Sequence, residues 1–169
     1  MIPEKTFILF MRQLLNIPIV FLIATMFMAC EKMPEGSDSV DQPGSSGTSE
    51  ARVVRVIDGD TVDVLISGTR HRVRLFGVDT PERGERCYME AAERTRELSG
   101  DVVVVESGPR TEDRYGRLLF YLFTQGGESI DAILVREGLA TAWTKDGQYR
   151  DLLLSMEKKA RSNGTGCLW

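Results

Sequence analysis

The chain has 169 residues, 42% hydrophobic and 27% charged, which fits one globular domain with additional segments. Its formal net charge of −4 excludes a protein that attracts nucleic acid through an overall positive field. Its one histidine excludes catalysis by a pair of histidines, and the spacing of its three cysteines fits no zinc site.

The first 29 residues are typical of an export signal. Lys5 and Arg12 precede an apolar run, Ile17–Ala29, that is too short to span a bilayer, which needs about 20 residues. The small residue followed by Cys30 is similar to the lipobox of bacterial lipoproteins, in which the cysteine is acylated and becomes the new N-terminus. We therefore predict a lipoprotein-type signal peptide over residues 1–29, a lipidated Cys30, and attachment to a membrane of the bacterial cell envelope.

Two features of this segment leave alternatives open. Phe27 and Met28 depart from the usual lipobox residues, so an uncleaved anchor or an ordinary signal peptide also fits, and the latter gives a secreted protein. Met11 is an alternative start, because it places Arg12 close to the apolar run.

Residues 30–50 are predicted to be a flexible tether. They are rich in Gly, Ser, Pro and acidic residues, and they lack the apolar side chains that a core requires. The remaining part, residues 51–169, holds 18 basic and 19 acidic groups and is nearly neutral. Any nucleic-acid binding there must depend on local clusters of charge.

Three strands are predicted at the start of this part, over Arg52–Ile57, Thr61–Ile66 and Arg70–Phe76. Glycine-containing links of the hairpin type separate them. In the third strand, one face carries an arginine at every second position: Arg70, Arg72 and Arg74.

The later segments alternate between helical and strand patterns. Helices are predicted over Cys87–Leu98, Ser129–Glu137 and Tyr149–Arg161, and strands over Val102–Val105 and Leu118–Phe123. This order predicts an α+β, mainly β fold: a five-stranded antiparallel barrel of the oligonucleotide-binding (OB-fold) type with three packed helices.

Three polar motifs lie between these elements. Asp58-Gly59-Asp60-Thr61 places two carboxylates at a strand turn, which suits a hard cation with oxygen ligands, although ordinary turn acids fit as well. In residues 74–82, an arginine at a strand end is followed by two acids three positions apart, Asp79 and Glu82, with Pro81 stiffening the chain between them. A strand that ends in a polar turn is the alternative.

The third motif, residues 110–117, places three arginines around Tyr115 and Gly116, just before a strand. Guanidinium groups match phosphate oxygens, and a tyrosine ring can stack on a base or sugar. A solvated turn is the alternative.

These three segments, in this order and spacing, resemble the staphylococcal nuclease (thermonuclease) family. The resemblance extends over about residues 53–169 and includes the run Ile133–Ala140 and the terminal Leu168-Trp169. It implies a calcium-dependent nuclease that cuts DNA and RNA with little sequence preference and leaves 3′-phosphate ends. The alternative is a barrel of the same type that binds single strands without cutting them. The protein is expected to be a monomer.

The resemblance also implies metal-binding and catalytic roles. Asp60, Asp79 and the backbone carbonyl of Thr80 take the positions of the calcium ligands, and Glu82 takes that of the carboxylate that activates water. The loop from Glu82 to Tyr88 is shorter than in the best-known member, and this bears on the placing of Glu82.

Four further positions match the residues that bind phosphate in the family. Arg74 and Arg117 correspond to the pair that contacts the scissile phosphate, and Arg114 and Tyr115 to the pair that holds a neighbouring one. No residue matches the family's second substrate-contacting tyrosine, although Trp143 is nearby in the sequence.

Cys87 and Cys167 are predicted to form a disulfide. Export implies an oxidising compartment, and these two cysteines remain once Cys30 is lipidated. Two buried free thiols are the alternative.

Overall fold

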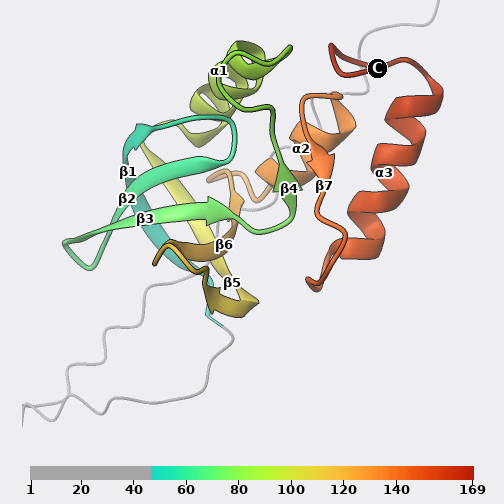
Figure 1. Cartoon of the computed structure of the whole chain (residues 1–169). Coiled ribbons are helices and arrows are strands. Elements are labelled where there is room, and N and C mark those ends of the chain that lie inside the picture. Colours follow the sequence, from blue (N-terminus) through green and yellow to red (C-terminus); the bar gives the residue numbers. More distant parts are fainter. Residues whose placement is uncertain (1–46) are drawn as a thin grey trace, which may run out of the picture. The chain divides into compact units, whose positions relative to one another are not determined.

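The computed structural model describes residues 47–169 (Figure 1). The predicted signal peptide, Cys30 and the tether up to residue 46 lie outside the described residues. The first strand begins at Ser49, two residues before the predicted start of the folded part.

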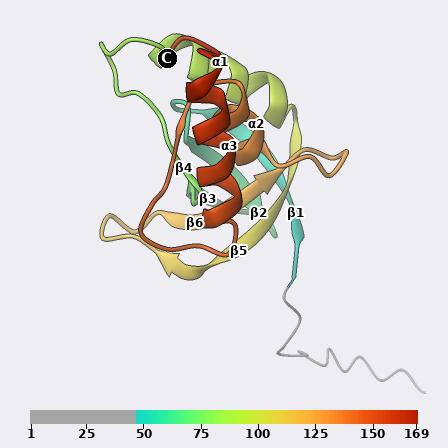
Figure 2. The same ribbon diagram turned by 90° about the vertical axis from the view of Figure 1, so that its right-hand side faces the viewer.

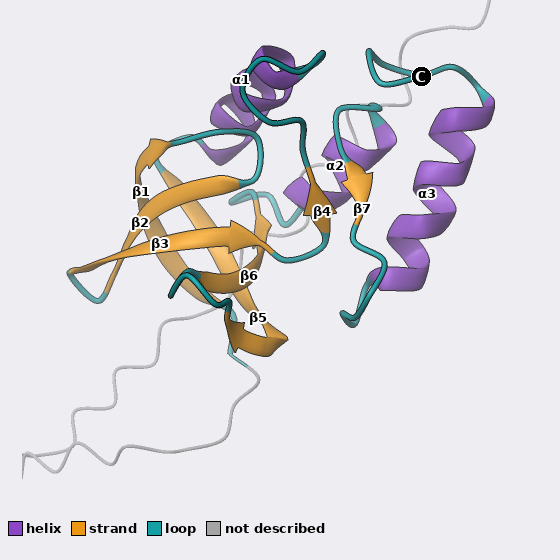
Figure 3. Ribbon diagram, viewed as in Figure 1, coloured by secondary structure: helices purple, strands orange, loops and turns teal. Residues whose placement is uncertain are grey.

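Five strands form a closed barrel in the order β1-β2-β3-β6-β5 (Figure 3). They are β1 (Ser49–Val56), β2 (Thr61–Ile66), β3 (Thr69–Leu75), β5 (Val102–Glu112) and β6 (Leu118–Phe123). The predicted barrel is therefore confirmed, but the expectation that it is antiparallel throughout is wrong, because β3 and β6 pair in parallel. A closed ring with an odd number of strands cannot alternate direction everywhere, so one neighbouring pair has to be parallel.

The alternation of side chains along β2 and β3 separates the core from the functional face. Val62, Val64, Val73 and Leu75 point inward and are fully buried. The intervening residues share the outer face of the barrel, where Thr61 pairs with Arg74, Asp63 with Arg72 and Leu65 with Arg70. The arginines on alternate positions of β3 therefore form one row.

Three helices lie beside this barrel: α1 (Tyr88–Ser99), α2 (Ile130–Arg136) and α3 (Arg150–Ser162). The hydroxyl of Ser129 caps α2 by accepting a hydrogen bond from Ala132 N at 3.2 Å. Helix α2 packs against α1, α3 and β6, and Figure 2 shows α3 in front of the other two helices. The apolar face of α3 buries Leu153 in the common core.

Two short strands that the sequence did not predict connect the barrel to the helical part. Strand β4 (Val78–Asp79) pairs with β7 (Thr141–Ala142), and the pair lies between the barrel and α3 (Figure 1). Two residues are too few to show a period in the sequence. Strand β4 matters because it fixes Asp79 at the end of β3.

Cys87, just before α1, is joined to Cys167 after α3, with their Cα atoms 5.8 Å apart. The bond fixes the start of α1 to the C-terminal segment. Within residues 47–169, no helix has the length and apolar character needed to cross a membrane.

Candidate active site

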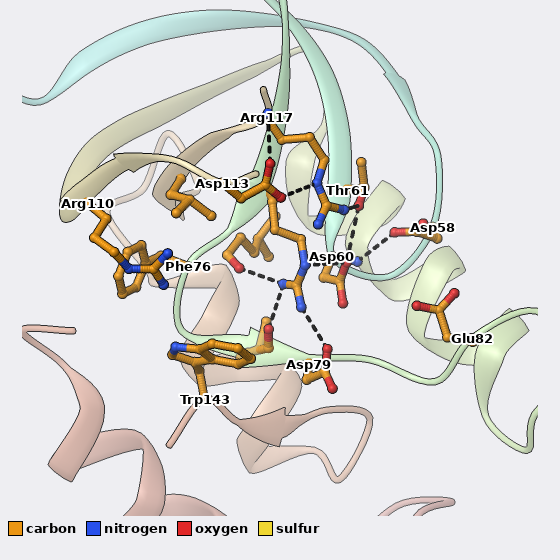
Figure 4. A pocket seen from close by; sticks show the side chains of 14 residues that line it. Asp58, Asp60, Thr61, Phe76, Asp79, Glu82, Arg110, Asp113, Arg117 and Trp143 are labelled. Atoms are coloured by element: carbon orange, nitrogen blue, oxygen red, sulfur yellow. Dashed lines mark hydrogen bonds and ion pairs between the residues drawn. The ribbon is translucent and has the colours of Figure 1, made fainter. Parts of the chain in front are cut away.

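A hollow of about 330 Å³ opens where β2, β3 and β4 meet (Figure 4). It brings together five of the residues singled out from the sequence: Asp60, Arg74, Asp79, Glu82 and Arg117. These residues come from the three motifs noted in the sequence, and the barrel places them around one space.

Asp60 is held firmly at the floor of this hollow. Its Oδ2 accepts hydrogen bonds from Thr80 N at 2.9 Å and Thr80 Oγ1 at 2.8 Å, and its Oδ1 accepts one from Thr61 Oγ1 at 3.2 Å. Gly59 permits this approach, because a Cβ there would lie 2.7 Å from Thr80 Oγ1. These three hydrogen bonds, together with the ion pair to Arg74, hold the carboxylate in place.

Arg74 stands between the two predicted metal-binding carboxylates. Its Nε lies 3.1 Å from Asp60 Oδ1, and its Nη2 lies 2.7 Å from Asp79 Oδ1. Its Nη1 donates to the carbonyl oxygens of Leu75 and Val78, both at 2.6 Å. Three of its five N–H donors are thus in hydrogen bonds, Nε forms the ion pair with Asp60, and the side chain is only 11% exposed. Arg74 therefore ties the end of β3 to β4 and keeps one donor for another ligand.

Arg117 is oriented by a residue that the sequence reasoning did not single out. Its Nε donates to Asp113 Oδ2 at 2.7 Å, and its Nη1 lies 3.5 Å from Thr61 Oγ1. Gly116 allows the turn between Asp113 and Arg117 with a φ of 74°. Partial burial raises the pKa of Asp113, but the hydrogen bonds from Arg117 and Tyr115 outweigh it, so the net pKa is lowered and the carboxylate stays charged.

The lining of the hollow has more negative than positive groups. Five carboxylates and three arginines contribute to it. Burial, and then the neighbouring charge of Asp60, raise the pKa of Asp58, so the carboxylates repel one another there. An excess of oxygen donors of this kind fits a hard divalent cation such as calcium.

The protein's own ligands for such a cation are few. Within residues 47–169, no three His, Cys, Asp or Glu side chains are grouped as a metal site. The predicted set has two carboxylates, Asp60 and Asp79, together with Thr80. Calcium takes about six to eight oxygen ligands, so the remainder must come from water or substrate.

Glu82 occupies the opening of the hollow. It follows Pro81 in the loop after β4, where its N–H donates to Glu85 Oε2 at 2.7 Å. Figure 4 shows its carboxylate facing the space near Asp79 and Asp58, with no contact drawn to the other lining residues. The side chain is exposed, so water reaches it.

Arg114 and Tyr115, the predicted second phosphate-binding pair, lie outside this hollow. The Tyr115 ring is 68% exposed and has the guanidinium carbons of Arg114 and Arg117 at 4.7 and 5.6 Å from its centroid. Tyr115 instead borders a second hollow of about 360 Å³ that shares Arg117 with the first. The structure therefore places this pair at the rim, beside Arg117.

Two further residues, Trp143 and Asp131, belong to the description of this region. Trp143, which follows β7, lines the hollow and donates from Nε1 to Asp146 Oδ1 at 2.8 Å. Asp131 is fully buried and accepts hydrogen bonds from Gly77 N at 2.9 Å and Leu122 N at 3.3 Å. Burial raises the pKa of Asp131 to about 6. In the sequence Asp131 occurs in the first turn of a helix, a common position for an acid, and nothing there indicates burial.

Comparisons with known proteins agree with this geometry. The family described as staphylococcal nuclease homologue matches residues 72–169. A micrococcal nuclease of Shigella flexneri is 38% identical over 69% of this chain and 71% of its own length. A thermonuclease of Staphylococcus hyicus is 33% identical over 85% and 90%, and an uncharacterized endonuclease of Escherichia coli O157:H7 is 34% identical over 70% and 75%.

Proposed function

Since the chain belongs to the staphylococcal nuclease family and is a phosphodiester-hydrolysing endonuclease, we propose that it cuts both DNA and RNA in a calcium-dependent reaction that leaves 3′-phosphate ends. The observation that carries this proposal is the meeting of Asp60, Arg74, Asp79, Glu82 and Arg117 around one hollow. In the proposed reaction, a water oxygen bonds to phosphorus, the P–O5′ bond breaks, and the O5′ atom takes up a proton.

The arginines supply donors for the extra negative charge that develops on the phosphate. Arg117 commits one donor to Asp113 and a second, at 3.5 Å, to Thr61, which leaves three of its five N–H groups for phosphate oxygens. Arg74 has one donor left while Asp60 and Asp79 hold it. Release of either carboxylate from Arg74 makes further donors available. Fixed donors of this kind typically contribute about 3–4 kcal/mol to a transition state.

Glu82 is the proposed proton acceptor. Asp60 and Asp79 are both paired with Arg74, whereas the Glu82 carboxylate faces the opening of the hollow. A base must reach the water whose proton it takes, and an exposed carboxylate at the entrance satisfies this condition. Glu82 is therefore better placed for the task than either aspartate.

Asp60, Asp79 and Thr80 would hold the calcium ion, which when bound supplies positive charge beside the reacting phosphate. Support comes from the oxygen-only donor set and from the carboxylate excess of the lining. Asp60 already accepts three hydrogen bonds and pairs with Arg74, so calcium ligation would compete with these contacts. Arg74 is the charged one among these donors.

The test uses purified protein with plasmid DNA and with RNA, first with calcium and then with a chelator. We expect calcium to support degradation of both substrates and the chelator to stop it. The fragments should block extension by a polymerase until a phosphatase removes the 3′-phosphate. Calcium-supported binding without cleavage would instead favour a single-strand-binding barrel that does not cut.

We also propose that Cys30 carries the lipid anchor and that the disulfide between Cys87 and Cys167 forms after export, since that compartment is oxidising. One acyl chain binds a membrane weakly, so stable attachment needs more than one chain on Cys30. Replacement Cys30→Ser should move the protein from the membrane to the soluble fraction of the cells. An unchanged membrane fraction would contradict lipidation at this position.

A further inference from the structure

A cluster of arginines lies on the outer face of the barrel beside the active site. Arg55 of β1 and Arg70 and Arg72 of β3 converge on a single carboxylate, Asp63 of β2. The nitrogen–oxygen distances are 3.1 Å for Arg55, 2.6 Å for Arg70 and 2.8 Å for Arg72. We refer to Arg55, Arg70 and Arg72, gathered on Asp63, as the arginine tract.

The tract has more positive charge than its own structure requires. Asp63 is 2% exposed and neutralises one of three guanidinium groups, while the arginine side chains remain 49–59% exposed. The three arginines together donate four hydrogen bonds to Asp63, and each arginine carries five N–H donors. Most of their donors therefore do not bond to Asp63. The tract therefore presents about two net positive charges to solvent, in a chain whose formal net charge is −4.

The tract is continuous with the active site. Arg70 and Arg72 lie on the same row of β3 as Arg74, and alternate residues of a strand are about 7 Å apart. The hollow of about 360 Å³ between them is lined by Asp63, Arg70, Arg72, Tyr115, Gly116 and Arg117. Arg117 also lines the active-site hollow, so the two hollows adjoin at this residue.

We propose that the arginine tract binds the sugar–phosphate backbone of the single strand that flanks the scissile phosphate, so that the substrate runs from Arg117 past Tyr115 onto Arg72 and Arg70. This inference rests on the proposed function, because it extends the same site. Asp63 holds the three guanidinium groups together against their mutual repulsion, and the N–H donors that it does not engage point to a role in binding phosphate oxygens. Exposed donors without base-reading side chains give binding that tolerates any sequence.

The test compares binding of single strands of about 4 and about 16 nucleotides, the range of site sizes known for such barrels. A Glu82→Gln background with calcium present limits cleavage during the measurement. We expect the longer strand to bind the background protein at least about tenfold more tightly, because it reaches the tract. The double variant Arg70→Gln/Arg72→Gln should lose most of this advantage. The slope of log K against log salt should become shallower by about 0.7 for each arginine removed.

Two further variants keep the test decisive. Arg70→Gln alone leaves Asp63 with Arg55 and Arg72, and it should give about half of the effect with an unchanged fold. Arg136→Gln/Lys158→Gln removes two exposed positive charges from α2 and α3 and is the matched control for net charge. Tract variants that keep the length advantage, or that change no more than the control, would overturn the inference.

The outcomes separate this inference from the proposed function. If the wild type shows calcium-dependent cleavage and the tract variants retain the length advantage, the tract inference is refuted and the nuclease proposal stands. A length advantage that the tract variants lose, in a wild type that does not cleave, supports the tract and refutes the nuclease proposal. If the background protein shows no length advantage, the tract does not bind the flanking strand.

Discussion

Two neighbouring groups of aspartates and arginines, one at the end of β3 and one along β2 and β3, differ in their ratio of arginines to carboxylates. In the active site, one arginine, Arg74, is shared by two carboxylates, Asp60 and Asp79. In the arginine tract, three arginines share one carboxylate, Asp63. The strand pairing that supports them is the same, since Thr61 lies opposite Arg74 and Asp63 opposite Arg72.

The proportion decides which ligand each group can take. Carboxylates in excess leave oxygen atoms for a cation, whereas arginines in excess leave N–H donors for phosphate. The burial of the groups follows the same division: Arg74 is 11% exposed, and the arginines of the tract are about half exposed. A nucleic-acid strand fits both groups: one phosphate lies at the cation site, and the phosphates next to it lie at the arginine tract.

The largest expected effect is on the active-site side of this comparison. Glu82→Gln keeps the size and polarity of the side chain but removes its ability to take a proton from water. We expect the cleavage rate to fall by about 10²–10⁴-fold, while strand binding changes little because the arginines remain. Initial rates on plasmid DNA and calcium-supported binding of an oligonucleotide measure the two quantities. A variant that cuts as fast as the wild type would remove Glu82 from its proposed role.

The next prediction compares stability after loss of Arg74, the one arginine between two carboxylates, with stability after loss of Arg70, one of three arginines on Asp63. Arg74→Ala leaves Asp60 and Asp79 without their common partner, and it also removes the Nη1 hydrogen bonds to two carbonyl oxygens. We expect the free energy of unfolding to fall by about 3–5 kcal/mol. Arg70→Ala leaves Asp63 with two other arginines, and we expect a loss below about 1 kcal/mol.

Urea unfolding of both variants measures this difference. Arg136→Ala, on the exposed side of α2, is the control for the loss of one arginine as such. Equal losses at Arg74 and Arg70 would mean that the number of arginines in a cluster does not govern its stability.

The fold was largely predictable from the sequence because the barrel strands and helices have clear apolar periods. Thr61–Ile66 and Leu118–Phe123 were predicted with their observed bounds. Strand β5, in contrast, continues to Glu112 instead of ending at Val105, because its second half is polar and shows no alternation. The parallel pairing of β3 with β6 depends on how the barrel closes, which no local pattern encodes.

The site was predictable only in part, for a similar reason. Arg74, Asp79 and Glu82 stand in one motif, so their grouping can be read from the sequence. The pairing of Asp63 with Arg55 and Arg72 follows from strand register, and a one-residue slip would have placed these side chains inside the barrel. The arginine alternation along β3 was visible in the sequence, but the carboxylate that collects the arginines was not.

Asp131 offers a third case, a carboxylate with which no arginine pairs in the described residues, and its pKa can be compared with that of Asp63. Burial raises its pKa to about 6, whereas arginine hydrogen bonds lower the pKa of Asp63 far below its usual range. The folded protein thus keeps a proton on Asp131 that the unfolded chain, with a pKa of 3.8, has released. Between about pH 4 and pH 6, Asp131 therefore lowers stability as the pH rises, by about 3 kcal/mol.

The measurement is urea unfolding of wild type and Asp131→Asn at the two ends of this range. Asparagine does not titrate, so the wild type should lose stability relative to the variant as the pH rises. Asp151→Asn, whose aspartate side chain is 90% exposed, is the control and should show no such trend. A difference between wild type and Asp131→Asn that is independent of pH would show that Asp131 does not titrate in this range.

The smallest expected effect comes from removing the one carboxylate of the arginine tract. Asp63→Asn removes the one negative charge and leaves three arginines facing one another. We expect stability to fall by about 1–3 kcal/mol, because charge-assisted hydrogen bonds to a 2%-exposed carboxylate are lost. The folded pKa of Asp63 is lowered, so its contribution is present above the unfolded pKa of 3.8 and disappears as the pH falls below it. The stability difference between wild type and variant should therefore shrink in acid.

Strand binding by Asp63→Asn should move in the opposite direction from stability. With Asp63 neutralised, the tract presents one more net positive charge, so the affinity for a long single strand should rise and its salt slope steepen by up to about 0.7. Glu128→Gln makes the same charge change on an exposed loop away from the tract and is the control. A purely structural ion-pair cluster would lose stability in Asp63→Asn and gain no more affinity than the control. A gain above the control, in a protein that is less stable, supports a phosphate-binding tract.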